Sequence, residues 1–351
     1  MKNILVTGGA GFIGSNFIIY MLGKHQDINI VNVDALTYAG NLKNLTAVEN
    51  DPRYSFVHAN ICDGETIAQL LRERNIDTII NFAAESHVDR SITDPQIFIH
   101  SNVLGTSTLL AAARDYWLGA DGSWREGVKY LQVSTDEVYG ALGAEGFFTE
   151  TTPLDPHSPY SSSKAGADLL VKAYRDTFGM PVNITRCSNN YGPYQFPEKL
   201  IPLMINNCLN HRQLPVYGDG LQVRDWLYVE DHCKAIDMVA RDGRPGEVYN
   251  IGGHNERANI FIVETIIDYL HEHADATIDR SLIKHVEDRK GHDRRYGIDP
   301  TKIRNELGWY PETPFEQGIV RTMQWYLDNS AWVQDVTSGD YQKYYAEHYG
   351  A

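Results

Sequence analysis

The chain has only four cysteines among its 351 residues, and their spacing excludes the usual cysteine chemistry. They lie far apart and form no C-x-x-C pair: Cys62, Cys187, Cys208 and Cys233. A zinc site or a disulfide framework requires cysteines at short, regular spacing. His271 and His273 flank Glu272 with no further ligand nearby, a pattern more typical of a solvated helix face than of a metal site. We therefore expect neither a disulfide-stabilised fold nor a bound metal.

Long hydrophobic runs and an excess of positive charge are also missing. No apolar run approaches the ~18 residues of a membrane-spanning helix, and the first strand reaches Gly8 too soon for a signal-peptide core. The formal net charge is −15, from 46 acidic and 31 basic residues. This balance argues against nucleic acid or an anionic membrane as a general partner, but it permits an anionic ligand where arginine and lysine gather. We expect a cytoplasmic protein.

What the sequence does contain is a glycine-rich turn near its N-terminus. A short apolar strand at residues 2–7 is followed by Gly8-Gly9-Ala10-Gly11-Phe12-Ile13-Gly14 and then by an apolar-periodic segment at 17–22. Gly9, Gly11 and Gly14 fit G-x-G-x-x-G, while Gly8, Gly11 and Gly14 fit G-x-x-G-x-x-G. In either frame, glycines let the backbone approach a pyrophosphate, which the N–H groups at the start of the helix bind. The motif predicts a dinucleotide site.

An acidic residue further along the chain distinguishes between two dinucleotides. The second strand, expected at 28–33, ends at Asp34, twenty residues after Gly14. A carboxylate there accepts hydrogen bonds from the adenosine ribose, and its charge repels a 2′-phosphate. The sequence therefore predicts NAD rather than NADP as the cofactor.

Strand-like runs alternate with helical segments over the first half of the chain. Strands are expected at 54–58, 76–83, 128–134 and 181–186, separated by amphipathic stretches such as 66–74. This alternation predicts an α/β fold, a Rossmann-type doubly wound parallel sheet with helices on both faces. A smaller, mostly helical lobe follows, interleaved in sequence because a strand expected at 247–251 returns to the sheet. We assign 1–187 and 229–253 to the Rossmann domain, and 188–228 and 254–351 to the second lobe.

Tyr160 and Lys164 lie four residues apart, so on a helix they share one face. A nearby ammonium stabilises a phenolate, and lowering the phenol pKa from ~10 to about 7 would let Tyr160 take a proton from an alcohol at neutral pH. A Tyr-x-x-x-Lys pair also occurs by chance in many helices. Here, however, Glu85-Ser86-His87 and Ser134-Thr135-Asp136-Glu137 follow expected strands, at the strand ends where ligands bind in such sheets. This placement independently indicates an active site.

A basic stretch stands out in this acidic protein. It spans 288–296 and contains Arg289, Lys290, Arg294 and Arg295. Such a run is usually a solvated surface. We nevertheless expect these cations, together with Arg224, to clamp a diphosphate, because a dinucleotide fold with a catalytic pair already requires a substrate pocket.

These motifs resemble the extended short-chain dehydrogenase/reductase family, in particular the 4,6-dehydratases of its nucleotide-sugar branch. The family resemblance rests on Thr7 to Gly14, on Tyr160-x-x-x-Lys164 and on the interleaved lobe, and it extends to about residue 310. The segments that resemble the dehydratases are 83–91, 134–140, 188–193 and 291–296. The adjacent acids Asp136 and Glu137 discriminate best, because epimerases and decarboxylases of this branch usually lack both.

The resemblance implies an NAD-dependent hydro-lyase whose second lobe binds a nucleotide sugar, dTDP-glucose. Tyr160 removes the C4 hydroxyl proton as NAD takes the hydride, Glu137 removes the C5 proton, and a protonated Asp136 donates to the departing C6 hydroxyl. Hydride return to C6 gives a 4-keto-6-deoxy sugar with no net change in NAD. Thr135 is expected to bond the sugar O4, and Lys164 the nicotinamide ribose. The implied setting is deoxysugar biosynthesis, of which dTDP-rhamnose is one product. The preference for thymine rests on the resemblance alone.

The resemblance also supplies two sets of binding residues. Cofactor contacts are expected from Gly8, Gly11, Phe12, Ile13, Gly14, Asp34, Ile61, Ala83, Ala84, Ser86, Tyr160, Lys164 and Asn190. Substrate contacts are expected from Ser86, Thr135, Asn189, Lys199, Leu200, Pro215, Tyr217, Arg224, Asn259, Arg289, His292 and Tyr296. Two positions depart from the family pattern, because Asn60 replaces a usual aspartate near the adenine and Ser101 a usual threonine. The segment 140–159 is also shorter than in many relatives.

Two other functions share part of this pattern. A UDP-sugar 4-epimerase or decarboxylase would perform the same first oxidation without losing water. A nucleotide-sugar or NAD-binding regulator would bind without turnover, but the catalytic groups at 136, 137, 160 and 164 are all intact, which favours an enzyme.

A homodimer is the expected assembly by family resemblance. Its interface would be formed by the helices expected at 160–178 and 104–117. The apolar residues on these helices equally suit the core of the monomer: Leu109, Leu110, Leu169 and Leu170.

Overall fold

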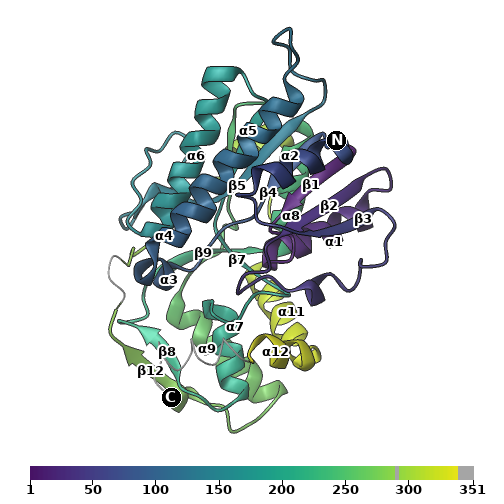
Figure 1. The fold of residues 1–351 in the computed structure, drawn as a ribbon. Helices are drawn as coiled ribbons and strands as arrows, with labels where there is room; N and C mark the ends of the chain where they lie inside the picture. Colours follow the sequence, from purple (N-terminus) through teal and green to yellow (C-terminus); the bar gives the residue numbers. More distant parts are fainter. Residues whose placement is uncertain (289–291, 339–351) are drawn as a thin grey trace.

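A seven-stranded parallel sheet forms the centre of the molecule (Figure 1). The computed structural model describes residues 1–288 and 292–338. The strand order is β10-β6-β5-β4-β1-β2-β3. These strands are β1 (Asn3–Thr7), β2 (Asn29–Asp34), β3 (Tyr54–His58), β4 (Thr78–Asn81), β5 (Lys129–Thr135), β6 (Val182–Cys187) and β10 (Val248–Ile251). The order β3-β2-β1-β4-β5-β6 is that of a doubly wound Rossmann sheet, so the predicted fold class is confirmed.

Helices cover both faces of the sheet, and the alternation of side chains along each strand decides which face each residue joins. Ile4 and Val6 of β1 belong to the core under α1 (Phe12–Lys24) and α8 (Val229–Asp242). Leu5 belongs to the opposite core, under α2 (Gly64–Glu73), α5 (Gly105–Trp117) and α6 (Pro159–Phe178). Every residue of β4, β5 and β6 is buried, as expected for strands covered on both sides.

The second lobe, below the sheet in Figure 1, has a hydrophobic core of its own. Its helices are α7 (Leu200–Leu209), α9 (Asn259–His273), α11 (Phe315–Asp328) and α12 (Ser330–Val336). Two small sheets accompany them: β11 (Glu256–Ala258), β9 (Val223–Tyr228) and β7 (Asn189–Tyr191), and the parallel pair β12 (Ile283–Val286) and β8 (Leu214–Tyr217). We did not predict these sheets, because strands this short carry little periodicity.

Short elements complete the described chain. They are η1 (Leu42–Leu45), α3 (Val88–Thr93), α4 (Pro95–Phe98), η2 (Ile99–Leu104), η3 (Asp136–Tyr139), η4 (Arg280–Leu282) and α10 (Thr301–Leu307). Among the described residues, no helix is both long and apolar enough to cross a membrane.

The chain returns to the main sheet through β10, which pairs in parallel with β6, so the expected return of 247–251 is confirmed. The segment 254–351, which follows β10, does not pack in the second lobe alone as we expected. Ile303 of α10 and Trp309 join the core under the sheet, although both lie within 254–351. The domain boundaries remain predictions, supported by the separate hydrophobic cores of the two parts.

The helix α6 begins where a capping box places it. The Ser158 hydroxyl accepts the N–H of Ser161 at 3.0 Å, and the Ser158 N–H donates to the Ser161 hydroxyl at 3.0 Å. Pro159 occupies the first helical position, where its missing N–H costs nothing. Tyr160 therefore lies in the first turn, and Lys164 one turn later on the same face.

The leucines considered for a dimer interface divide between core and surface. Leu109 and Leu110 are completely buried against the sheet, so the alternative that they fill the monomer core is confirmed. Leu170 is partly buried against the same core. Leu169, in contrast, is 57% exposed.

Candidate active site

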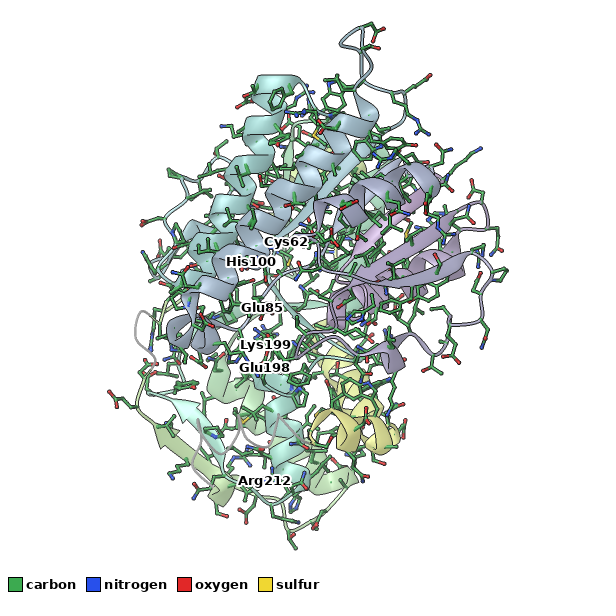
Figure 2. The ribbon with its side chains drawn as sticks, in the orientation of Figure 1. Cys62, Glu85, His100, Glu198, Lys199 and Arg212 are labelled. Carbon is green, nitrogen blue, oxygen red and sulfur yellow. The ribbon has the colours of Figure 1, made fainter. Side chains whose placement is uncertain are left out.

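Two adjoining cavities open at the carboxyl ends of the parallel strands, as expected for this sheet topology. The larger, of about 310 Å³, lies over the glycine turn and the ends of β2 and β5. The smaller, of about 180 Å³, extends into the second lobe. The residues that line both are Glu137, Asn189, Asn190, Gln195, Glu198 and Lys199. Figure 2 shows Glu198 and Lys199 between the sheet and the second lobe, below Glu85.

The glycine turn fits a dinucleotide diphosphate. Gly8 adopts a left-handed φ of 68°, and a Cβ at Gly14 would collide with the Gly8 carbonyl. The N-cap Gly11 has no side chain to cap α1, so the N–H groups at the helix start are available to an anion. Gly9 does not line the cavity, and a Cβ there would collide with Asn32 of β2. Of the two possible frames, the G-x-x-G-x-x-G frame is therefore the one that faces the ligand.

Asp34, at the end of β2, lies on the wall of the larger cavity. Its Oδ2 accepts the N–H of Ala10 at 2.9 Å, and its Oδ1 accepts the N–H of Leu36 at 2.8 Å. Burial raises the pKa of this carboxyl. Each oxygen retains a second lone pair, so the carboxylate can also accept the ribose hydroxyls of NAD.

The structure brings nearly all the sequence-predicted binding residues to these cavities. Every residue expected to contact the cofactor lines the larger one, as do the two departures from the family pattern, Asn60 and Ser101. The expected substrate residues divide between the cavities. Ser86 and Thr135 line the larger cavity, and the smaller is lined by Asn189, Lys199, Leu200, Pro215, Tyr217, Arg224, Asn259, His292 and Tyr296. Arg289 lies outside the described residues.

The two adjacent acids follow directly from the end of β5. The Thr135 hydroxyl caps η3 by accepting the N–H of Glu137 at 3.3 Å, and it lies 3.3 Å from Oδ1 of Asp136. Asp136 is only 2% exposed, and its Oδ2 has no hydrogen-bond partner within the described part of the chain. Burial, followed by the charge of Glu137, raises the pKa of Asp136 well above its usual value. This shift favours the protonated carboxyl, which is the form that can donate a proton.

Tyr160 does not behave as the sequence suggested. Burial and the nearby Glu137 raise the pKa of its phenol well above the usual value, with a smaller opposing effect from a hydrogen bond to Thr135. Lys164 donates to the carbonyl oxygen of Val133 at 2.8 Å, and burial lowers its pKa. The prediction that Lys164 brings the phenol pKa toward neutrality is therefore wrong for the protein alone. The reason is that burial disfavours the charged phenolate, while the Lys164 ammonium donates to the Val133 carbonyl oxygen.

Arg224 is the cation best placed for a diphosphate. It is 7% exposed, and its guanidinium lies 4.2 Å from the centre of the Tyr296 ring. Its hydrogen bonds within the described chain go to the carbonyl oxygens of Val223 and Asp293 at 2.8 and 2.9 Å. Its positive charge therefore remains for an anionic ligand, and His292 lies on the same cavity wall.

The wider basic clamp is not formed as predicted. Arg294 pairs with Asp219 at 2.8 Å, and Arg295 pairs with Glu256 at 2.7 Å. Neither arginine lines either cavity. Their inclusion in the clamp is therefore wrong, because acidic side chains of the second lobe already neutralise them. Lys290, like Arg289, lies outside the described residues.

Glu198 is the clearest site residue that the sequence analysis missed. Arg90 donates to it at 3.2 Å, and burial raises the pKa of both Glu198 and Glu85. Other cavity residues that were not predicted include Gln195, Phe196, Cys187 and Ser188. The available signal was the position of Glu198 next to Lys199. A single glutamate before a helix is otherwise indistinguishable from a surface residue.

The known proteins that are similar to this chain bear names that agree with the geometry of the site. The family described as GDP-mannose 4,6 dehydratase matches residues 5–322. A dTDP-glucose 4,6-dehydratase of Xanthomonas campestris pv. campestris is 54% identical, covering 97% of this chain and 98% of its own length. An Escherichia coli protein of the same name is 51% identical, covering 99% and 98%.

Solved structures agree with the sequence relatives. The Bacillus anthracis dTDP-glucose 4,6-dehydratase in complex with NAD is 51% identical, with a TM-score of 0.86 over 96% of this chain and 100% of that one. The Streptomyces venezuelae enzyme with NAD and dTDP bound is 47% identical, with a TM-score of 0.88 over 95% and 100%. A UDP-glucose 4-epimerase of Thermotoga maritima shares the fold, with a TM-score of 0.82 over 94% and 100%, but is only 26% identical.

Gly14→Ala tests whether the glycine turn receives the diphosphate. The new methyl group collides with the Gly8 carbonyl, so the turn must open. We expect NAD affinity, measured by calorimetry, to fall by about tenfold or more. Gly23→Ala, in the same helix with nothing within 4 Å of the added methyl, is the matched control and should bind NAD as the parent does. Equal affinity of both variants would contradict the assignment.

Proposed function

The chain belongs to the GDP-mannose 4,6-dehydratase family, and we infer that it converts dTDP-glucose to dTDP-4-keto-6-deoxyglucose and water. It is an NAD-dependent hydro-lyase with a Rossmann-type cofactor domain. The observation that carries the dehydratase reaction is the buried Asp136, which lines the cavity beside Glu137, has a raised pKa and keeps an Oδ2 without a partner among the described residues. An epimerase, which expels no hydroxyl, has no use for such a donor.

We propose that Tyr160 takes the proton of the C4 hydroxyl as the C4 hydride leaves. Thr135 supports this step, because its hydroxyl lies between the phenol and Asp136 and can also bond the sugar O4. Bound NAD accepts this hydride and later returns it to C6, and its positively charged ring adds the stabilisation of the phenolate that Lys164 alone does not supply. Lys164 is held by the Val133 carbonyl at a position suited to the nicotinamide ribose.

The elimination step divides between the two adjacent acids. The C4 ketone acidifies the C5 proton, which Glu137 removes as a base. Asp136 gives its proton to the C6 hydroxyl, which leaves as water. The C5–C6 double bond then accepts the hydride at C6 and a proton at C5, from the protonated Glu137. Burial suits Asp136 to its role, because it raises the pKa of the carboxyl and so favours the protonated form that donates.

The nucleotide end of the substrate is assigned to the smaller cavity. Arg224 and His292 would bind the diphosphate there, and Tyr296 stacks beneath the Arg224 guanidinium. Asn259 has a buried side-chain oxygen without a partner among the described residues, which makes it a candidate acceptor for a ligand N–H. Ser86, Asn189, Lys199, Leu200, Pro215 and Tyr217 complete the proposed substrate contacts.

We also propose a homodimer and a cytoplasmic location. Four large apolar residues are about half exposed on the neighbouring segments α4, η2 and α6: Ile97, Ile99, Leu104 and Leu169. A cluster of this kind is typical of a protein interface. In Figure 1, α5 and α6 lie side by side at the outer surface of the sheet domain.

All four cysteines are free thiols, which is consistent with a reducing compartment.

The function is tested by incubating the purified protein with dTDP-glucose and, separately, with UDP-glucose. We expect mass spectrometry to show loss of one water from dTDP-glucose without consumption of added NAD. An unchanged mass with altered sugar stereochemistry would point instead to an epimerase. Tight binding without turnover, unaffected by Tyr160→Phe, would point to a binding protein.

Asp136→Asn tests the assignment of the acid. The amide retains the shape of the side chain but cannot give up a proton, so elimination should slow by about 10²–10⁴-fold. C4 oxidation remains possible, so absorbance at the NADH band should build up on the enzyme. Tyr160→Phe is the contrasting variant, in which no NADH should appear. In the parent, kcat/KM should fall as pH rises through the raised pKa of Asp136, because only the neutral acid donates. Undiminished turnover by the Asn variant would refute the role.

Leu169→Lys tests the proposed dimer. A charge among these exposed apolar residues should convert the protein to a monomer, as measured by analytical ultracentrifugation. Val320→Lys, at a helical site on α11 that is also exposed, is the matched control and should leave the assembly unchanged. Unchanged assembly in the Leu169 variant would exclude this face.

A further inference from the structure

The last described helix, α12, is linked by hydrogen bonds to the glycine turn. Trp332 donates its indole N–H to Oδ1 of Asn44 at 2.8 Å, and Asn44 donates its amide N–H to the carbonyl oxygen of Ala10 at 2.9 Å. The same carbonyl accepts the backbone N–H of Asn41 at 3.0 Å, while the Ala10 N–H donates to Asp34. Ala10 lies between the glycines of the turn, so these bonds fix the loop that receives the diphosphate.

The Trp332 N–H decides which way the Asn44 amide points. An indole nitrogen is only a donor, and a carbonyl oxygen is only an acceptor. With the amide oxygen on Trp332 and the amide nitrogen on Ala10, both bonds are satisfied. Reversing the amide would bring two donors together at one end and two acceptors at the other. Asn44 is 1% exposed, so water cannot easily replace a lost partner.

The position of Trp332 is itself well fixed. Its ring packs at steep angles against those of Trp325 and Tyr194, with centroid distances of 5.1 and 6.1 Å. Lys43, next to Asn44 in the chain, pairs with Asp335 of α12. In Figure 1, α12 lies among the yellow C-terminal helices below the purple N-terminal segment. The family match ends at residue 322, so α12 lies outside it.

We propose that α12 is part of the NAD site, and that Trp332 is a positioning residue which acts through Asn44 to hold the Ala10 carbonyl and the glycine turn in their binding conformation. This inference rests on the proposed NAD-dependent function and assigns to α12 a role in retaining the cofactor. Retention matters in a reaction that takes a hydride from the substrate and returns it within one turnover, because an enzyme that released its reduced cofactor midway would stop.

Trp332→Phe is the direct test, because it keeps an aromatic ring in the cluster and removes only the indole and its N–H. We expect the equilibrium dissociation constant for NAD, measured by calorimetry on the full chain stripped of nucleotide, to rise by about threefold to tenfold, as expected for one lost hydrogen bond. The fraction of NAD that copurifies should fall. Activity should return when NAD is added in excess, with the KM for dTDP-glucose unchanged.

Two further variants separate this role from a general loss of stability. Trp325→Phe makes the same change in the same aromatic cluster without touching Asn44, and it should bind NAD like the parent. Asn44→Asp keeps the acceptor for Trp332 but loses the donor to Ala10. It should therefore weaken NAD binding by itself, and adding Trp332→Phe to it should weaken binding little further.

The outcomes are distinct. Parental NAD affinity in Trp332→Phe, or an equal loss in Trp325→Phe, would overturn the inference while leaving the dehydratase assignment intact. A parent protein that binds no NAD would overturn both. Weaker binding confined to Trp332→Phe and Asn44→Asp, with non-additive effects, would support the relay.

Discussion

A buried hydrogen-bond network that joins three parallel strands underlies the whole site. Thr7 of β1 donates to Oδ1 of Asn81 on β4 at 2.6 Å, and the Asn81 amide donates to Gln132 of β5 at 2.9 Å. Thr7 and Asn81 are the last residues of their strands, and Gln132 lies three residues before the end of β5, so all three adjoin the loops that line the cavities. A slip of one residue in this register would turn every side chain to the opposite face and separate the glycine turn from the catalytic acids. Because the partners are almost completely buried, such a slip would also leave polar groups unsatisfied.

Burial also shifts the pKa values of Asp136, after β5, and Tyr160, in the first turn of α6, and the shift suits an acid but not a base. Low polarity raises the pKa of Asp136, which suits a proton donor. The same environment raises the pKa of Tyr160 and so opposes its use as a base. Burial therefore suits Asp136 to its proposed role but not Tyr160.

The site residues that the sequence identified are those whose chemistry is local. The glycine turn, Asp34 at the end of β2, and the Tyr160–Lys164 pair each lie within one strand end or one helical turn, and the structure places them all on the larger cavity. The prediction of binding residues was weaker for long side chains, which can pair either with a ligand or with a residue distant in the chain. Arg294 and Arg295 carried the right charge, but Asp219 and Glu256, distant in sequence, neutralise them. Glu198 gave only the weak signal of its position next to Lys199, because its place on both cavity walls follows from where the second lobe meets the sheet.

By itself, the sequence determined the alternation of strands and helices, the dinucleotide turn, the pair of acids and the return of residues 247–251 to the sheet. These features depend on periodicity, spacing and residue type, which are properties of short segments. Only the tertiary structure decided that Gly8 rather than Gly9 faces the cavity, that Asp136 is buried with an unpartnered oxygen, and that α12 is linked through Asn44 to the glycine turn. The physical reason is that each depends on burial or on contacts between segments far apart in the chain, such as Trp332 and Asn44, and neither quantity can be read from local sequence.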